Sequence, residues 1–190
     1  MKITDFSIQP LINPRFVFTS LATYYQNGIK KSWEIVKAHD SVAVLLYHTT
    51  KNAFVLVKQF RPATYASAHT TGMSIELCAG IVDKNFSLEK IVQEEILEEC
   101  GYDVELSKIT KITSFYTSVG FAGSKQTLYY AEIDESMMVS SGGGIDHEMI
   151  EVVYLDINEA KKLMFDDDTI KTPGLLFAFL WWFNKREISI

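Results

Sequence analysis

The sequence has few cysteines, no dense run of basic residues and no apolar segment long enough to cross a membrane. Only Cys78 and Cys100 occur among its 190 residues, too few and too far apart for a zinc knuckle. We expect both to be reduced thiols in a cytoplasmic protein. The net charge of −6 and the scattered Lys and Arg residues argue against a nucleic-acid partner.

Signals for export or membrane insertion are also missing. Residues Met1 to Asp5 carry no basic region followed by an apolar run, so we expect no secretion. The apolar stretch from Pro173 to Phe183 is well short of the roughly 20 residues that a membrane span needs. We therefore predict a buried helix in this stretch and no membrane partner.

The first part of the chain is rich in β-forming residues. Residues 16–25 and 32–37 contain many β-branched and aromatic side chains, and they flank Asn27-Gly28, which favours a type I′ turn. This pattern predicts an N-terminal antiparallel hairpin lobe over residues 1–39 and a main domain over residues 40–190. The composition, 47% apolar and 22% charged, is typical of a globular protein.

Strands and helices are mixed along the main domain, which predicts an α/β (α+β) fold. Pro62 ends one strand, while Ser87 and Gly101 have the residue types of a helix N-cap and C′ position. The run from Ser140 to Gly144 predicts a flexible loop, and the small polar segment 65–72 predicts another. The expected strands are 41–47, 53–59, 73–79, 109–116, 125–133 and 150–155, and the expected helices are 88–100, 158–165 and 172–185.

The helix expected over residues 88–100 carries carboxylates where apolar side chains belong. On a helical wheel, Glu95 and Glu99 fall within the apolar arc, and Glu98 borders it. Burying an ionised carboxylate without a partner costs several kcal/mol. The helix dipole also disfavours negative charge at this end of the helix. A cation is therefore needed to compensate the acids.

Two interpretations of this acidic helix imply different functions. A solvated acidic face is the usual reason for a Glu-rich helix, but here the acidic and apolar arcs coincide. A metal site is the other interpretation, since clustered carboxylates without Cys or His favour Mg²⁺, or alternatively Mn²⁺, over zinc. Magnesium in turn indicates phosphate chemistry, because it bridges carboxylates and the phosphate oxygens of a substrate.

The segment from Gly80 to Tyr102 resembles the signature of the Nudix hydrolase family. The resemblance implies a Nudix fold, in which a mixed β-sheet is sandwiched between helices. It also implies a Mg²⁺-dependent pyrophosphohydrolase. Four residues stand in the family register when they are counted from Gly80: Glu95, Glu98, Glu99 and Gly101.

Two positions depart from the family signature. Phe86 stands where the family usually has Glu, and Glu94 stands where it usually has Arg. That Arg normally helps to hold the catalytic glutamates in place. Lys58, Lys90 and Lys125 are the candidates to replace it.

Characteristic segments outside the signature include Val57-Lys58-Gln59-Phe60-Arg61-Pro62, Glu76-Leu77-Cys78-Ala79-Gly80 and Gly123-Ser124-Lys125-Gln126. These segments resemble the UDP-sugar pyrophosphatase branch of the family. The resemblance implies hydrolysis of a UDP-glucose-like nucleotide sugar to a nucleoside monophosphate and a sugar 1-phosphate. The related ADP-ribose pyrophosphatases usually carry Ser-Pro-Gly where this chain has Ser118-Val119-Gly120, which favours a UDP-sugar over ADP-ribose. ADP-ribose stays the alternative substrate. A weakly active nucleotide-binding module and a structural dimerisation protein are further alternatives.

The resemblance assigns roles to particular residues. Glu148 would contact a metal or activate water as a base, with a solvated acid as the plain alternative and Glu151 as the rival base. Tyr25 and Trp33 would stack on the base of the substrate or pack a dimer. Arg61 would clamp a phosphate, unless it is an ordinary surface residue. The implied set is Glu98 and Glu148 as catalytic residues, Arg61, Trp33 and Tyr25 as substrate-binding residues, and Ala79, through its backbone carbonyl, with Glu95 and Glu99 as metal ligands.

The hairpin lobe and the apolar segment 173–183 also predict a homodimer. Each would expose a large apolar surface in a monomer. Members of this branch of the family are dimers, sometimes with exchanged N-terminal lobes.

Overall fold

The computed structural model of the chain describes residues 3–68 and 70–190. The chain divides into two compact units, of which the first is Met1–His39 with Tyr116–Ser124 and the second is Asp40–Phe115 with Lys125–Ile190. Residues 116–124 therefore group with the hairpin, although they follow the expected start of the main domain. Residues 1 and 2 of the expected lobe, and residue 69 of an expected loop, lie outside the described residues.

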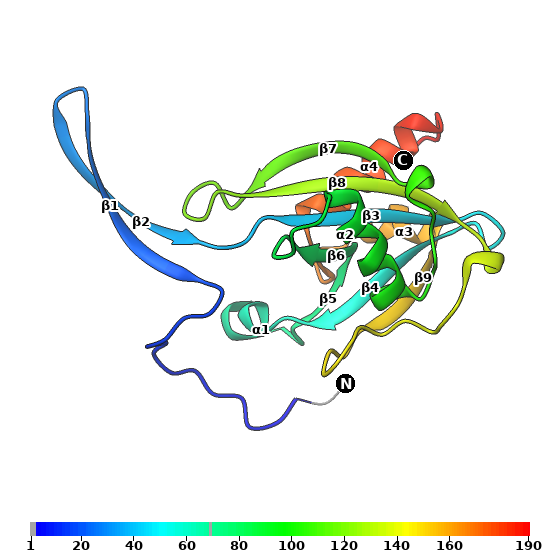
Figure 1. Cartoon of the computed structure of the whole chain (residues 1–190), viewed down its shortest axis with the longest axis horizontal. Coiled ribbons are helices and arrows are strands. Elements are labelled where there is room, and N and C mark those ends of the chain that lie inside the picture. Colours follow the sequence, from blue (N-terminus) through cyan, green and yellow to red (C-terminus); the bar gives the residue numbers. More distant parts are fainter. Residues whose placement is uncertain (1–2, 69) are drawn as a thin grey trace. The chain divides into compact units, whose positions relative to one another are not determined.

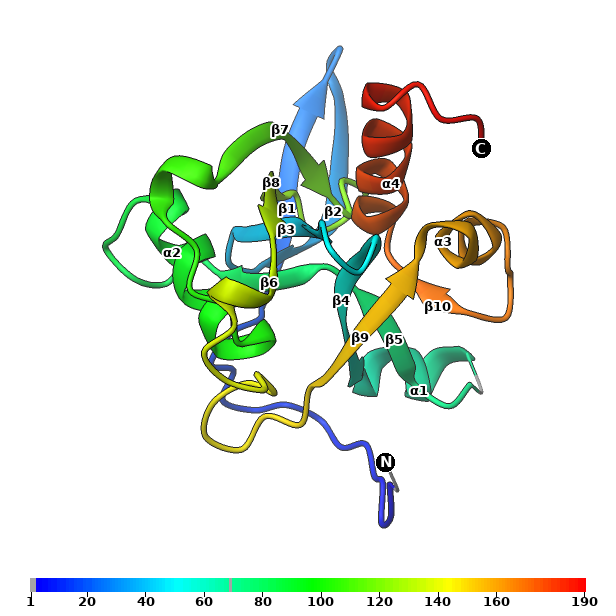
Figure 2. The same ribbon diagram turned by 90° about the vertical axis from the view of Figure 1, so that its right-hand side faces the viewer.

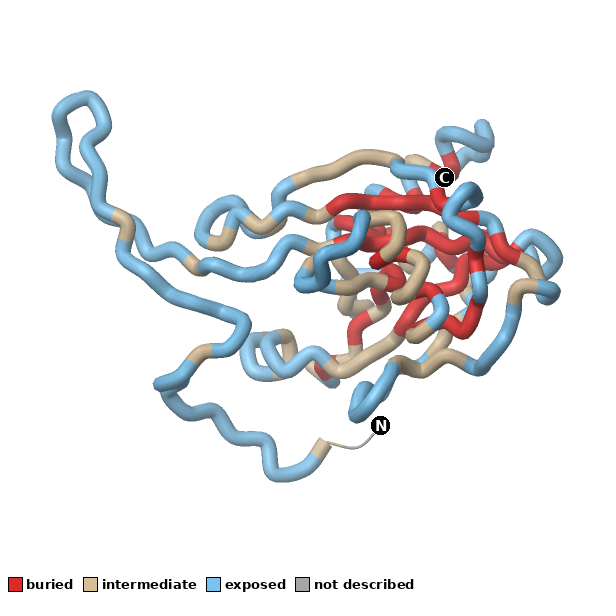
Figure 3. The backbone as a smooth tube through the Cα atoms, in the orientation of Figure 1, coloured by how far each residue is buried: buried red, intermediate tan, exposed pale blue. Residues whose placement is uncertain are grey.

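The first unit contains the expected hairpin, formed by β1 (Phe18–Gln26) and β2 (Ile29–Lys37) (Figure 1). The strands pair antiparallel, with Gln26 opposite Ile29. Asn27 and Gly28 have φ angles of 53° and 79°, as a type I′ turn requires, so the turn prediction is confirmed. Most residues of both strands are exposed (Figure 3).

The second unit is built on a mixed sheet with β3 (Ser41–His48) near its centre. This strand pairs parallel to β8 and antiparallel to β4 and β6. The full path is β10-β5-β4-β3-β8-β7, with β6 on β3 and β9 on β4. The other strands are β4 (Ala53–Phe60), β5 (Met73–Glu76), β6 (Cys78–Ile81), β7 (Thr110–Thr117), β8 (Ser124–Ile133), β9 (Glu151–Asp156) and β10 (Ile170–Lys171).

Helices cover both faces of this sheet, because β3 is apolar on both of its faces. Val44 packs with the helix α2 (Leu88–Glu95) in one buried cluster. Leu45, on the opposite face, packs with α3 (Ile157–Met164) and α4 (Pro173–Lys185) in a second cluster. Figure 2 shows α2 on one side of the sheet and α3 and α4 on the other. The expected fold, a mixed sheet between helices, is confirmed.

The apolar segment 173–183 forms part of α4 and belongs to the core. Leu175, Phe179 and Phe183 of this helix are fully buried. No helix in the described ranges is long and apolar enough to cross a membrane.

Two local predictions are wrong. Residues 62–68 form the short helix α1 (Pro62–Ala68), although part of this segment was expected to be a loop. The strand expected over 73–79 is broken at Leu77, because β5 pairs with β4 whereas β6 pairs with β3. The change of partner between two neighbouring strands depends on contacts with distant segments, which the local sequence pattern does not indicate.

The glycine run is anchored by hydrogen bonds, although the sequence predicts a flexible loop. The amides of Gly143 and Gly144 donate to the carbonyls of Glu99 and Glu98, at 2.9 and 3.0 Å. These carbonyls lie at the end of the acidic helix, where intrahelical partners are missing. Gly142 has a φ of 65°, and a Cβ atom there would overlap the carbonyl oxygen of Glu99. The run therefore caps the end of the acidic helix.

This contact predicts the effect of Gly142→Ala, with Gly123→Ala as a matched control. Gly123 has a similar φ of 70° but open space around it, so its substitution should cost only about 1 kcal/mol of backbone strain. Gly142→Ala should cost more, because the new methyl group pushes the run off the helix. Amide hydrogen exchange should accelerate at Gly143 and Gly144 in Gly142→Ala alone. Equal exchange at these amides in the two variants would contradict the anchoring.

Candidate metal and hydrolytic site

The acidic helix has an irregular end. Ser87 accepts a hydrogen bond from the backbone N–H of Lys90 at 3.2 Å, and Gly101 has a φ of 80°, so the expected N-cap and C′ residues are confirmed. The α-helix itself stops at Glu95, and Ile96–Cys100 form a π-helical turn. A regular helical wheel could not foresee this turn. Such π-turns are rare and frequently mark functional sites.

Glu99 is a buried acid within this turn. Its side chain is part of the core, and only 5% of the residue is exposed. Its carboxylate accepts hydrogen bonds from the backbone N–H of Ala79, at 2.9 Å, and from the Cys78 thiol. Burial raises the pKa of Glu99 to about 7, although both hydrogen bonds oppose the shift. Both of these donors are neutral, and the charge of Arg61 interacts with Glu99 without a hydrogen bond among the described residues.

Glu95 lies beside Glu99 in a similar environment. Its pKa is also raised to about 7, first by burial and then by the charge of Glu98. The carboxylate packs directly on Gly80, where a Cβ atom would overlap its oxygen. The charge of Glu95 in turn raises the pKa of Glu99. Two acids that repel one another in a poorly solvated place favour a bound cation.

Glu148, and not Glu151, belongs to this group. The charge of Glu148 raises the pKa of both Glu95 and Glu99. Its side chain accepts a hydrogen bond from the N–H of Ile145 at 3.1 Å, and it lies against the anchored glycine run. Glu151 instead begins β9, opposite Lys58 in the sheet, and its carboxylate is 3.8 Å from the Lys58 ammonium.

Arg61 has a partner that the sequence analysis missed. Its guanidinium donates from Nε and Nη2 to the two carboxylate oxygens of Glu76, at 2.7 and 2.5 Å. Glu76 is only 7% exposed, whereas the Arg61 side chain is 45% exposed. This pair fixes the guanidinium and leaves its other N–H groups available. An acid inside the apolar strand pattern of residues 73–79 was the signal for it.

The three lysines proposed to replace the family Arg have other contacts, and a fourth lysine makes a shorter ion pair with Glu94 than Lys90 does. Lys58 contacts Glu151, and Lys90 donates to Gln93 at 2.8 Å and lies 3.9 Å from Glu94. Lys125 has a backbone contact to Asp40. The ammonium of Lys84 lies 3.0 Å from the Glu94 carboxylate, which the sequence analysis did not foresee.

Tyr25 and Trp33 lie in the first unit, whereas the other six candidate residues lie in the second. Trp33 donates its indole N–H to the carbonyl of Gly120 at 2.6 Å. This bond ties the hairpin to the 116–124 segment within the first unit. Tyr25 is 73% exposed.

The residues of the acidic helix fit a hard divalent cation. Across residues 3–68 and 70–190, no three His, Cys, Asp or Glu side chains converge into a preformed metal cage. Magnesium does not need one, because it is commonly bound by one or two carboxylates, waters and substrate phosphates. Glu95 and Glu99 supply two such carboxylates without Cys or His, and their raised pKa values reflect a charge that a cation would neutralise.

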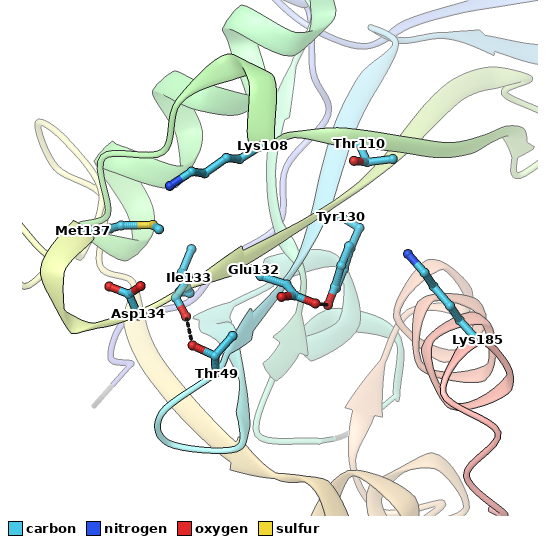
Figure 4. A pocket seen from close by; sticks show the side chains of 9 residues that line it. All are labelled: Thr49, Lys108, Thr110, Tyr130, Glu132, Ile133, Asp134, Met137 and Lys185. Carbon is cyan, nitrogen blue, oxygen red and sulfur yellow. Dashed lines mark hydrogen bonds between the residues drawn. The ribbon is translucent and has the colours of Figure 1, made fainter.

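A separate cavity of about 430 Å³ contains none of these residues (Figure 4). It is lined by residues of β7, β8 and α4 together with Thr49, Lys108, Asp134 and Met137. Its acids already have protein partners, since Glu132 accepts from Tyr130 and Arg186, and Asp134 accepts from Ser136. This cavity is therefore not the candidate hydrolytic site.

Comparison with known proteins identifies relatives that cover most of the chain. The chain is 38% identical to the uridine diphosphate glucose pyrophosphatase of Bos taurus, over 85% of each protein. It is 34% identical to the Mus musculus protein of the same name, over 85% of this chain and 86% of the relative. The GDP-mannose pyrophosphatase of Pectobacterium atrosepticum is 36% identical over 74% of this chain and 72% of its own length. No protein-family model matches the chain.

Proposed function

Because the chain belongs to the Nudix family, as its relatives establish, we propose that it hydrolyses the pyrophosphate bond of a nucleotide sugar. The products are a nucleoside monophosphate and a sugar 1-phosphate. The observation that carries this proposal is the pair of poorly solvated carboxylates, Glu95 and Glu99, on a helix in the family register. The relatives that carry UDP-glucose and GDP-mannose in their names support a nucleotide sugar as the substrate class.

We assign UDP-glucose as the preferred kind of substrate. The mammalian relatives named for UDP-glucose match a larger share of this chain than the bacterial relative named for GDP-mannose. Val119, in place of the proline usual in ADP-ribose pyrophosphatases, adds to this preference. ADP-ribose and GDP-mannose are the competitors that a substrate panel must include.

The cation proposed for the acidic helix is Mg²⁺, with Mn²⁺ as a substitute. Glu95 and Glu99 would hold it, together with the carbonyl of Ala79, and Glu98 would support them. When bound, the cation neutralises the pyrophosphate charge and makes a water molecule more acidic. Arg61 has N–H groups that Glu76 does not occupy, and these would donate to a phosphate oxygen of the substrate.

Glu148 is the proposed base that accepts the proton of the attacking water. Its charge acts on both Glu95 and Glu99, which supports a role for it at the proposed metal centre. The anchored glycine run would hold Glu148 there, because the segment joins the helix end to this side chain. Glu151 is engaged by Lys58 and is the weaker candidate.

We also propose that the protein is a homodimer in the cytoplasm, joined through the first unit. A groove of about 670 Å³ runs along the hairpin and includes Leu21, Ile35 and Phe121. These three side chains are exposed and apolar, and a second copy of the chain would cover them. The two buried, free cysteines suit the reducing environment of the cytoplasm.

The activity proposal predicts a strict need for a divalent cation and a preference for nucleotide sugars. Purified protein with Mg²⁺ should cleave UDP-glucose to UMP and glucose 1-phosphate, and excess EDTA should abolish the reaction. The panel should include GDP-mannose, ADP-ribose and diadenosine polyphosphates, with products identified by chromatography. Turnover in EDTA would contradict the metal centre. A tenfold higher kcat/KM for ADP-ribose, about 1.4 kcal/mol, would assign the chain to the alternative substrate.

The base assignment predicts different effects for Glu148→Gln and its matched control Glu151→Gln. Loss of a general base should lower kcat by roughly 10²- to 10⁴-fold in Glu148→Gln, with little change in KM or in Mg²⁺ dependence. Glu151→Gln removes only a contact to Lys58 and should retain near-normal kcat. Steady-state kinetics over a range of Mg²⁺ concentrations measures both. The reverse pattern would move the role to Glu151, and normal rates in both variants would exclude a carboxylate base from this loop.

The dimer proposal predicts that Leu21→Lys gives a monomer, because the substitution places a charge in the apolar groove. Phe165→Lys is the control, since Phe165 is also exposed and apolar but lies in the second unit. Sedimentation should show a dimer for the wild type and Phe165→Lys. A monomeric wild type, or a dimeric Leu21→Lys variant, would be evidence against the hairpin interface.

A further inference from the structure

The acids of the helix face a lysine from the loop between β6 and α2. The ammonium of Lys84 is 3.0 Å from the Glu94 carboxylate, ten residues along the chain. The charges of Glu98 and Glu95 also act on Lys84 and, with Glu94, raise its pKa. The charge of Lys84 in turn opposes part of the rise in the pKa of Glu95 that burial causes. Lys84 thus contacts Glu94 directly, and it also interacts electrostatically with Glu95 and Glu98.

The loop that carries Lys84 is fixed at both ends. The N–H of Val82 donates to the carbonyl of Asp40 at 2.8 Å, next to the central strand β3. At the other end, Ser87 caps the helix through the N–H of Lys90. Lys84 connects the middle of this loop to the last α-helical turn. The contacts of Val82, Lys84 and Ser87 together fix the loop at both ends and join its middle to the helix at Glu94.

We propose that Lys84 and Glu94 are a positioning pair that holds the acidic helix in the geometry needed for cation binding. This inference rests on the proposed function, because it concerns the same metal centre. The family signature has a positive residue where this chain has Glu94, so the charge at this position is reversed. Lys84 supplies the missing positive charge from the loop. The ion pair fixes the position of the loop relative to the helix.

Stability alone does not explain the pair. The side chains are 42% and 23% exposed, and exposed ion pairs contribute little to folding. The charge of Lys84 and a positioning role of Lys84 would change cation affinity in opposite directions. Lys84 repels a bound cation, so its removal should strengthen cation binding if its charge is all that matters. Removal of a positioning residue should weaken cation binding instead.

The test is a double-mutant cycle read by direct Mg²⁺ binding. Isothermal titration of the full-length protein should show weaker binding for Lys84→Met and for Glu94→Gln, by about threefold to tenfold each. The double variant should bind no more weakly than either single variant, because the two residues act as one unit. Lys90→Met is the matched control, since Lys90 is also near Glu94 but donates to Gln93, and its Mg²⁺ affinity should stay close to the wild-type value.

Two further measurements separate positioning from other outcomes. Lys84→Arg keeps the charge and the reach, so it should restore Mg²⁺ affinity, and thermal unfolding in EDTA should show that every variant is folded. Tighter Mg²⁺ binding by Lys84→Met, weaker binding by Glu94→Gln and a double variant close to the wild type would overturn the proposal in favour of simple charge addition. A wild type that binds no Mg²⁺ would instead refute the metal centre of the proposed function, and this inference with it.

Discussion

Two carboxylates held out of water are the constraint around which the second unit is built. Burial raises the pKa of Glu95 and Glu99 to about 7, so at neutral pH negative charge on these two side chains is unfavourable. Glu99 accepts hydrogen bonds from the neutral groups of Ala79 and Cys78, which offset only part of the cost of its burial. The helix itself leaves α geometry at this point and continues as a π-turn. A site that accepts such a cost before any ligand binds is suited to a divalent cation.

The chain around these acids has glycines where a side chain would clash and hydrogen-bonding groups where the helix needs partners. Gly80 has no side chain where Glu95 lies, and Gly142 has none where the run meets the carbonyl of Glu99. The glycine run brings Glu148 to the acids and also satisfies carbonyls at the helix end. Arg61 is held by a buried acid of its own, Glu76, at the end of a strand. Rigid backbone thus positions the candidate catalytic groups.

The spacing of apolar residues and the residue types in turns predicted those parts of the structure that depend on residues close together in the sequence. The hairpin followed from Asn27-Gly28, and the half-buried acids followed from the helical arc of Glu95 and Glu99. Contacts between distant segments could not be predicted in this way. The Lys84 contact joins a loop to a helix residue ten positions along the chain, and the Glu76 partner of Arg61 depends on the pairing of β4 with β5. The π-turn changes helical geometry without any residue that signals it.

We propose above that the acidic helix holds the catalytic cation. Crystals grown with Mn²⁺ and a non-hydrolysable UDP-glucose analogue would test it most directly, because anomalous scattering locates the metal independently of activity. The account predicts a peak bound by carboxylate oxygens of Glu95 and Glu99, with phosphate oxygens of the analogue among its ligands. A peak elsewhere in the protein, or the analogue bound without a metal at these two residues, would contradict it.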